Sequence, residues 1–240
     1  MNVWGKLLDL DGAYKDEGFL RTFKRPPLFI RDSFFFLATV IFRLLFKADI
    51  RGIEHLPEGG PYIVAANHSS ALDYPVVAWS MPKPARDELY AVTTSYFYDN
   101  PFTRFFIMIA TNSIRVDTQD DYGPALKTAA KVLAQGGSVY INPEGTWSED
   151  GALMAFKPGV GLLSYMLKVP IVPVYLGGTF DILPAKAIFP RKRGSVKVYF
   201  GKPIYPDNYL SVDPGYDVFK RIADDVRGEI VRLRDKKDSV

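Results

Sequence analysis

A chain of 240 residues is long enough for one domain with an added element, but short for two full-sized domains. Hydrophobic residues make up 48% and charged residues 24%, which excludes disordered and collagen-like classes. The 30 Lys and Arg residues against 27 Asp and Glu leave a net charge of +3, too balanced for a basic nucleic-acid-binding face, so we expect no nucleic-acid partner. Because there is no cysteine and only two histidines, we expect no zinc, iron–sulfur or other metal site.

The first fifty residues combine basic positions with an aromatic, apolar run. Residues 1–18 show no pattern typical of a signal peptide. The apolar run from Ser33 to Phe46, interrupted only by Arg43, is shorter than the roughly 20 residues that cross a bilayer. Two interpretations stay open: a buried core helix, or an interfacial helix whose aromatic face enters a membrane surface. In the second, the cations that meet anionic head groups are Lys24, Arg25, Arg31 and Arg43.

From about residue 50, short β-branched or aromatic runs alternate with helical segments. The expected strands are Tyr62–Ala66, Leu89–Val92, Ser113–Val116, Ser138–Ile141, Ile171–Leu176 and Val196–Phe200. The expected helices are Pro75–Ser80, Pro101–Ile109, Tyr122–Gln135, Gly159–Leu167 and an amphipathic closing helix, Tyr216–Arg234. The alternation predicts an α/β fold over residues 51–240, a mixed, mostly parallel sheet flanked by helices. Residues 1–50 are expected to form a separate, membrane-associating helical segment.

A histidine and an aspartate follow the first of these strands, in the segment Asn67-His68-Ser69-Ser70-Ala71-Leu72-Asp73. Open α/β sheets place their sites at the carboxyl ends of strands. If a helix starts at Ser69 or Ser70, the Asp73 carboxylate can reach back to the imidazole and leave its other nitrogen free as a general base. The alternative is that Ser70 and Asp73 form a helix-start capping box and His68 merely lies nearby.

A second constellation, Asn142-Pro143-Glu144-Gly145-Thr146-Trp147-Ser148, follows the strand expected at 138–141. A glycine beside an acid and two hydroxyls favours a turn with free backbone N–H groups, suited to an anionic or oxygen-rich ligand. Lys157 comes just before an expected helix, where its ammonium and the helix dipole could act on one anion. The pair Gly159 and Gly161 lacks the preceding strand and third glycine of a dinucleotide fingerprint.

In this order and spacing, the segments resemble the glycerolipid acyltransferases typified by 1-acylglycerol-3-phosphate acyltransferase. Asn67-His68 with Asp73 matches the family's N-H-x-x-x-x-D block. Pro143-Glu144-Gly145-Thr146 with Ser148 matches its P-E-G-T-R-S block, and Ile171-Val172-Pro173-Val174 its V-P-V-like block. The resemblance covers about residues 50–205.

The resemblance implies transfer of a fatty acyl group from a thioester, either acyl-CoA or an acyl carrier protein, to the hydroxyl of a lipid alcohol. His68 would act as general base and Asp73 would orient it. The family pattern assigns Glu144, Gly145 and Thr146 to acceptor contact, and Lys157 could meet a phosphate of donor or acceptor. No cofactor is implied beyond the acyl donor, and the expected location is the cytoplasmic face of a membrane.

Two positions depart from the family pattern. The block that reads G-x-I-F-V-D-R in the family ends here in Asp117-Thr118, and Trp147 stands in place of the arginine of P-E-G-T-R-S. By resemblance those arginines hold the acceptor's phosphate, for which a guanidinium is the best partner. Either Arg115 substitutes, or the acceptor carries no phosphomonoester.

Two other functions stay open at this point. The same histidine and aspartate could activate water, giving a thioesterase, although the chain has no G-x-S-x-G elbow of a serine hydrolase. A membrane-associated acyl- or lipid-binding protein without turnover is the non-enzymatic alternative.

Overall fold

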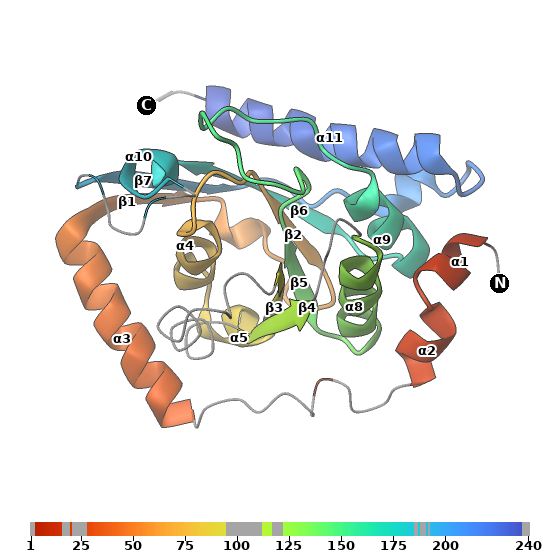
Figure 1. Ribbon diagram of the computed structural model, residues 1–240, viewed down its shortest axis with the longest axis horizontal. Coiled ribbons are helices and arrows are strands. Elements are labelled where there is room, and N and C mark those ends of the chain that lie inside the picture. Colours follow the sequence, from red (N-terminus) through yellow and green to blue (C-terminus); the bar gives the residue numbers. More distant parts are fainter. Residues whose placement is uncertain are drawn as a thin grey trace.

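The computed structural model describes residues 3–15, 20, 28–94, 112–116, 122–184, 187, 191 and 193–236. Within them, a seven-stranded sheet runs through the centre of the molecule in the order β1-β7-β6-β2-β5-β3-β4 (Figure 1). All neighbouring strands are parallel except β6 and β7. The mixed, mostly parallel sheet expected from the sequence is therefore confirmed. The strands are β1 (Phe46–Arg51), β2 (Ile63–Ala66), β3 (Leu89–Thr94), β4 (Asn112–Val116), β5 (Ser138–Ile141), β6 (Ile171–Gly177) and β7 (Gly194–Phe200).

Helices cover both faces of the sheet, which is why its central strands are continuously apolar. Alternation along β2 sends Ile63 and Ala65 to a core shared with α8, α9 and α11, and Val64 and Ala66 to a core shared with α4. The described helices are α1 (Val3–Leu7), α2 (Leu10–Lys15), α3 (Leu28–Leu45), α4 (Asp73–Ser80), α5 (Lys83–Asp87), α8 (Gly123–Ala134), α9 (Gly159–Leu167), α10 (Thr179–Ile182) and α11 (Tyr216–Asp235), with 3-10 turns η2 (Ile53–His55) and η3 (Pro206–Tyr209).

The expected elements agree with the structure in type and differ mainly at their ends. Strand 138–141 and helix 159–167 have the predicted bounds, whereas the helix expected at 101–109 lies outside the described residues. Strand β1 was not expected, because only Phe46 belongs to the apolar run and the charged side chains of Lys47, Asp49 and Arg51 give no buried-strand pattern. Helix α3 ends at Leu45, and β1 pairs with β7 from Phe46 opposite Gly194 onward.

The glycine at 161 has a packing role where α9 meets α11. A Cβ on Gly161 would lie 2.1 Å from the carbonyl oxygen of Phe219. The two backbones approach so closely that a side chain does not fit between them. Close helix packing therefore accounts for this glycine without a dinucleotide.

The described residues among the first fifty form two differently packed parts. Helices α1 and α2 lie at the opposite side of the molecule from α3 (Figure 1). Leu8 and Leu10 are buried in the same core as α8 and α9, and the Trp4 indole N–H donates to the carbonyl of Pro214 at 3.1 Å. The division expected after residue 50 falls inside β1, so part of this region belongs to the core of the sheet domain.

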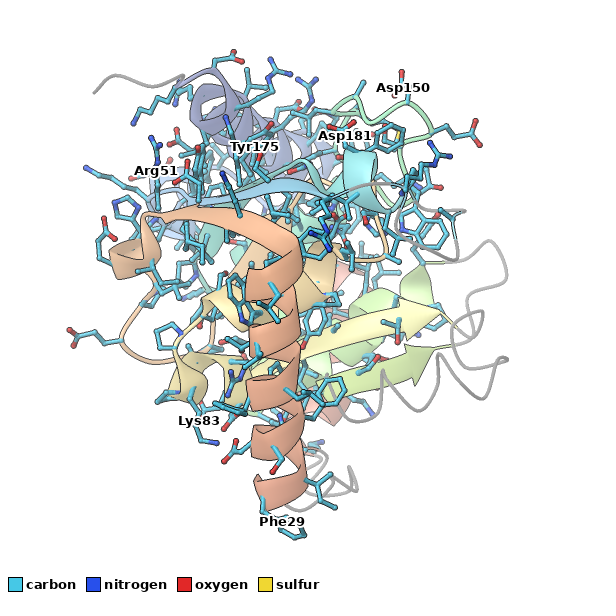
Figure 2. The ribbon with its side chains drawn as sticks, turned by 90° about the vertical axis from the view of Figure 1, so that its left-hand side faces the viewer. Phe29, Arg51, Lys83, Asp150, Tyr175 and Asp181 are labelled. Atoms are coloured by element: carbon cyan, nitrogen blue, oxygen red, sulfur yellow. The ribbon has the colours of Figure 1, made fainter. Side chains whose placement is uncertain are left out.

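Helix α3 presents one face to α4 and α5 and the other to solvent. On the inner face, the Trp79 indole N–H donates to Thr39 Oγ1 at 2.9 Å, and the Arg86 guanidinium lies 4.0 Å from the centre of the Phe35 ring. Figure 2 shows the helix along one side of the molecule, with Phe29 at its far end. Its outer face carries a stripe of exposed apolar side chains, which we call the α3 stripe: Phe29, Ile30, Phe36, Leu37, Val40 and Leu44. No helix in the described ranges is both long enough and apolar enough to cross a bilayer.

Candidate active site

The two sequence constellations meet because their strands are neighbours. Strands β2 and β5 run parallel, with Ala65 opposite Ile141, so the loops that follow them leave the same edge of the sheet. The Asn142 amide joins the two loops by donating to the carbonyls of Ala66 and Asn67 at 3.1 and 3.2 Å. The segment of His68 therefore lies directly against the segment of Glu144.

His68 and Asp73 form a hydrogen-bonded pair. His68 Nδ1 lies 3.0 Å from Asp73 Oδ2, and the side chains are 22% and 1% exposed. The same carboxylate oxygen accepts the backbone N–H groups of Ser69 and Ser70 at 2.8 and 2.9 Å. Asp73 is the first residue of α4, so its carboxylate also binds the turn that precedes this helix. The reciprocal bond of a capping box is not formed between Ser70 and Asp73, because Ser70 Oγ accepts the Leu72 N–H at 3.0 Å instead. A carboxylate on Nδ1 leaves Nε2 as the nitrogen that can accept a proton.

The loop after β5 binds both the backbone N–H and the backbone carbonyl of His68. Glu144 Oε1 accepts the His68 N–H at 3.1 Å, and the Ser148 N–H donates to the His68 carbonyl at 2.8 Å. The Glu144 side chain is only 3% exposed. Burial raises the pKa of Glu144 to about 7, against the lowering effect of the N–H groups of His68 and Met154.

The raised pKa makes Glu144 a source of pH-dependent stability. Between its ordinary value of 4.5 and about 7, the folded chain keeps a proton that the unfolded chain has lost, so the free energy of unfolding falls as pH rises. We expect Glu144→Gln to remove this fall. Between pH 5 and pH 8, the free energy of unfolding of the variant should rise by about 2 to 3 kcal/mol relative to that of the wild type. Urea unfolding across this range measures it, with Glu58→Gln, at an exposed position, as control. Parallel curves for Glu144→Gln and wild type would contradict the prediction.

The ammonium group of Lys157 lies against Gly145 in the same loop. The glycine's φ of +77° lies in the left-handed region, and a Cβ there would lie 2.7 Å from Lys157 Nζ. Lys157 Nζ is 4.0 Å from the centre of the Tyr122 ring, and the Tyr122 hydroxyl donates to the Gly145 carbonyl at 2.8 Å. Thr146 follows as an exposed side chain. The loop therefore presents an ammonium group and a hydroxyl at its surface.

Trp147 lies next to the histidine. The two rings are 5.5 Å apart between centroids and tilted by 55°. An aromatic surface thus stands beside His68 where the family pattern has a guanidinium. Arg115 belongs to β4 by its backbone, but its side chain and the whole of Thr118 lie outside the described residues.

Six of the seven predicted site residues come together around one loop junction: His68, Asp73, Glu144, Gly145, Thr146 and Lys157. Sequence reasoning missed Tyr122, whose ring lies against the Lys157 ammonium, and gave no separate role to Asn142, which joins the two loops. Asn142 could have been found from its place directly after a strand, whereas Tyr122 belongs to no motif. In the described ranges, no group of three or more His, Cys, Asp or Glu residues is placed to hold a metal ion.

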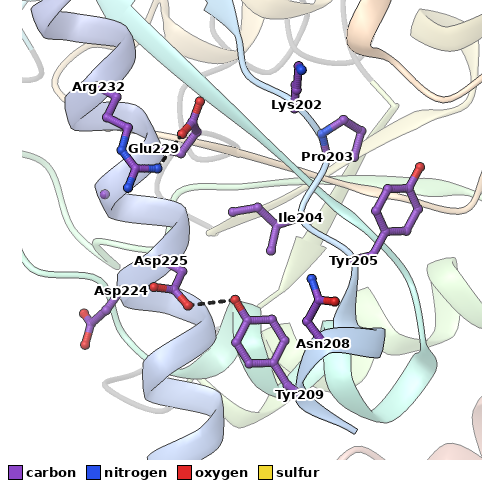
Figure 3. Close-up of a pocket in the computed structure, with 11 residues that line it drawn as sticks. Lys202, Pro203, Ile204, Tyr205, Asn208, Tyr209, Asp224, Asp225, Glu229 and Arg232 are labelled. Atoms are coloured by element: carbon purple, nitrogen blue, oxygen red, sulfur yellow. Dashed lines mark hydrogen bonds and ion pairs between the residues drawn. The ribbon is translucent and has the colours of Figure 1, made fainter.

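A groove between η3 and α11 lies away from this site (Figure 3). Its wall residue Ile204 pairs with Ile171, the first residue of β6, so the groove is at the opposite edge of the sheet from His68. Four of its polar side chains bond in pairs: the Tyr209 hydroxyl donates to Asp225 at 2.7 Å, and Arg232 pairs with Glu229 at 3.0 Å. The groove contributes nothing to the chemistry of His68.

The fold and the site define an α/β protein with a histidine–aspartate pair at the carboxyl edge of its sheet. The Acyltransferase family model matches residues 47–177, and the chain belongs to this family. The chloroplastic 1-acyl-sn-glycerol-3-phosphate acyltransferase BAT2 of Brassica napus is 30% identical over 161 residues, which cover 67% of this chain and 46% of that protein. Human 1-acyl-sn-glycerol-3-phosphate acyltransferase alpha is 27% identical over 135 residues, 56% of this chain and 47% of its own.

Among solved structures, the 1-acyl-sn-glycerophosphate acyltransferase PlsC from Thermotoga maritima shares the fold. The TM-score is 0.68 at 20% sequence identity, and the match covers 99% of this chain and 96% of that one. The chain spans about half the length of the curated relatives described above. The family resemblance expected from the sequence motifs is therefore confirmed.

Proposed function

We propose that the protein transfers a fatty acyl group from a thioester to the hydroxyl of a glycerophospholipid-type acceptor. The observation that carries this proposal is the hydrogen bond of 3.0 Å between His68 Nδ1 and Asp73 Oδ2, at the junction with the Glu144 loop. The printed names of the curated relatives, 1-acyl-sn-glycerol-3-phosphate acyltransferases, support the same reaction class.

In the proposed reaction, His68 acts as general base through Nε2. It takes the proton of the acceptor hydroxyl as the oxygen attacks the thioester carbonyl carbon, and Asp73 stabilises the resulting imidazolium. When the tetrahedral intermediate collapses, the carbon–sulfur bond breaks and the thiolate takes the proton from His68. The products are an ester and a free thiol, so neither an acyl-enzyme nor a cofactor is needed.

The acceptor is proposed to lie over the exposed side of the Gly145 loop. Lys157 and the Thr146 hydroxyl offer polar contacts there, and the ammonium of Lys157 suits a phosphate of donor or acceptor. Trp147 offers an aromatic surface next to the base. A phosphomonoester would need Arg115 as a further partner, and an acceptor without one would not.

The α3 stripe is proposed to dock the protein on a membrane surface, peripherally or monotopically, with the catalytic domain on the cytoplasmic face. Its six apolar side chains lie on one face of the helix, while the opposite face is fixed to α4 and α5. Both the acyl chain and a lipid acceptor reside in membranes, so docking would bring the site to its substrates.

The test is transfer of a labelled acyl group from acyl-CoA or from acyl carrier protein to a panel of acceptors. The panel contains glycerol 3-phosphate, lysophosphatidate, lysophospholipids with substituted head groups and neutral lipid alcohols. We expect ester formation with at least one lysophospholipid. Preference for lysophosphatidate would support Arg115 as a phosphate ligand, and preference for another acceptor would support a site changed by Trp147.

Two outcomes of the panel would overturn the proposal. Release of free fatty acid without any ester would favour the thioesterase. Binding of the acyl chain with neither hydrolysis nor transfer, from both donors, would favour the lipid-binding protein.

A further inference from the structure

The Glu144 carboxylate faces the protein interior. Its side chain is 3% exposed, and Oε1 accepts the His68 N–H at 3.1 Å. The Met154 N–H lowers the pKa of the carboxyl and so favours its charged form. Oε2 is buried without a hydrogen-bond partner among the described residues. A side chain in this position acts on the backbone of His68 rather than on a ligand at the surface.

A second charged residue, Arg227, binds the backbone of the segment that contains Met154. Arg227, on α11, donates through Nε to the Met154 carbonyl at 2.8 Å and through Nη2 to the Leu153 carbonyl at 3.4 Å. Its positive charge also lowers the pKa of Glu144. Arg227 thus holds the backbone at residues 153 and 154, and the Met154 N–H in turn favours the charged form of Glu144.

Helix α11, which carries Arg227, is packed firmly into the core. It packs against β6 and α9, and one side of the helix is buried: Val218, Phe219, Ile222, Ala223, Val226, Ile230 and Leu233. Hydrogen bonds and electrostatic interactions therefore link a buried helix, through Arg227, Met154 and Glu144, to the backbone of His68. Arg227 lies outside all the sequence motifs that point to the active site.

We propose that Arg227 and Glu144 are positioning residues that hold the backbone of His68, and hence its imidazole, in place for proton transfer. The consequence for turnover rests on the proposed role of His68 as general base. General-base catalysis depends on hydrogen-bond reach to the proton that is abstracted, and displacement of a reacting group by about 1 Å can cost on the order of 100-fold in rate. In this proposal Glu144 positions His68, and the exposed groups of the loop contact the acceptor.

The first test measures the His68 amide directly, without any assay of activity. Hydrogen exchange of that amide is followed by NMR in wild type, Arg227→Gln, Glu144→Ala and a control, Arg232→Gln. Arg232 lies on the same helix, is 76% exposed and pairs only with Glu229 in the described contacts. We expect exchange at His68 to accelerate about tenfold or more in Arg227→Gln and Glu144→Ala and to stay unchanged in the control.

The second test measures turnover in the same proteins. We expect Arg227→Gln to lower kcat about tenfold with KM for both substrates unchanged, and Arg227→Lys, which keeps the charge and one donor, to recover part of the loss. Because both residues act through the same contacts, Arg227→Gln combined with Glu144→Ala should lose less than the product of the two single effects.

Unchanged exchange at the His68 amide in Arg227→Gln and Glu144→Ala would overturn the proposal. Equal acceleration at amides throughout the sheet would also overturn it, because that result indicates general destabilisation. A raised acceptor KM at unchanged kcat in Glu144→Ala would instead return Glu144 to acceptor contact. If no acyl transfer occurs at all, the exchange measurement still decides whether Arg227 and Glu144 hold His68, so the two failures are distinguishable.

Discussion

Replacing His68 by alanine is expected to lower kcat for acyl transfer about 1,000-fold or more. The variant has no group that can take the proton of the attacking hydroxyl, and a positioned acid–base side chain contributes on the order of 100- to 10,000-fold. The measurement is the initial rate of ester formation from labelled acyl-CoA and the preferred acceptor, at saturating concentrations of both.

The loss should not reflect unfolding. In His68→Ala, Asp73 Oδ2 still accepts the N–H groups of Ser69 and Ser70, so the start of α4 keeps its partners. The matched control is His55→Ala. His55 is the other histidine of the chain; it lies on η2, away from the site, and bonds to the carbonyl of Phe200 at the end of β7. Activity within a few-fold of wild type in His68→Ala would remove this residue from the mechanism.

The triple variant Phe36→Ser, Leu37→Ser, Leu44→Ser is expected to weaken binding to phosphatidylcholine–phosphatidylglycerol vesicles about 100-fold or more. These side chains are 72%, 57% and 73% exposed. Burying one such side chain in an apolar phase is worth about 1.5–3 kcal/mol, and each 1.4 kcal/mol changes affinity about tenfold. Vesicle sedimentation over a range of lipid concentrations gives the partition coefficients.

The control replaces three exposed side chains elsewhere by serine: Tyr205, Val212 and Tyr216, which are 51%, 46% and 58% exposed. It should bind vesicles as the wild type does. Deletion of residues 1–50 is a poorer test, because it removes Leu8 and Leu10 from the core and most of β1 from the sheet. Wild-type sedimentation of the triple variant would place membrane docking on another surface.

Much of the fold was predictable, because the signals for it are local. Continuous apolar runs such as Tyr62–Ala66 indicate strands buried on both faces, and the spacing of apolar residues in 216–234 indicates a helix with one buried side. The pairing of His68 with Asp73 was also within reach, since the two lie five positions apart at a helix start. The capping and catalytic interpretations could not be separated from sequence. In the structure, one Asp73 oxygen bonds to the His68 ring and to the N–H groups of Ser69 and Ser70, without the reciprocal Ser70 bond of a capping box.

The sequence by itself therefore determined the α/β class, the family and the residues that form the loop junction. The tertiary structure decided the rest: that β1 completes the sheet beside β7, that α3 turns its apolar stripe outward, and that Glu144 points inward to the His68 backbone with Arg227 behind it. The physical reason is distance along the chain. Contacts between residues 70 to 150 positions apart are set by the strand order and by which faces the helices cover, and no local pattern encodes either.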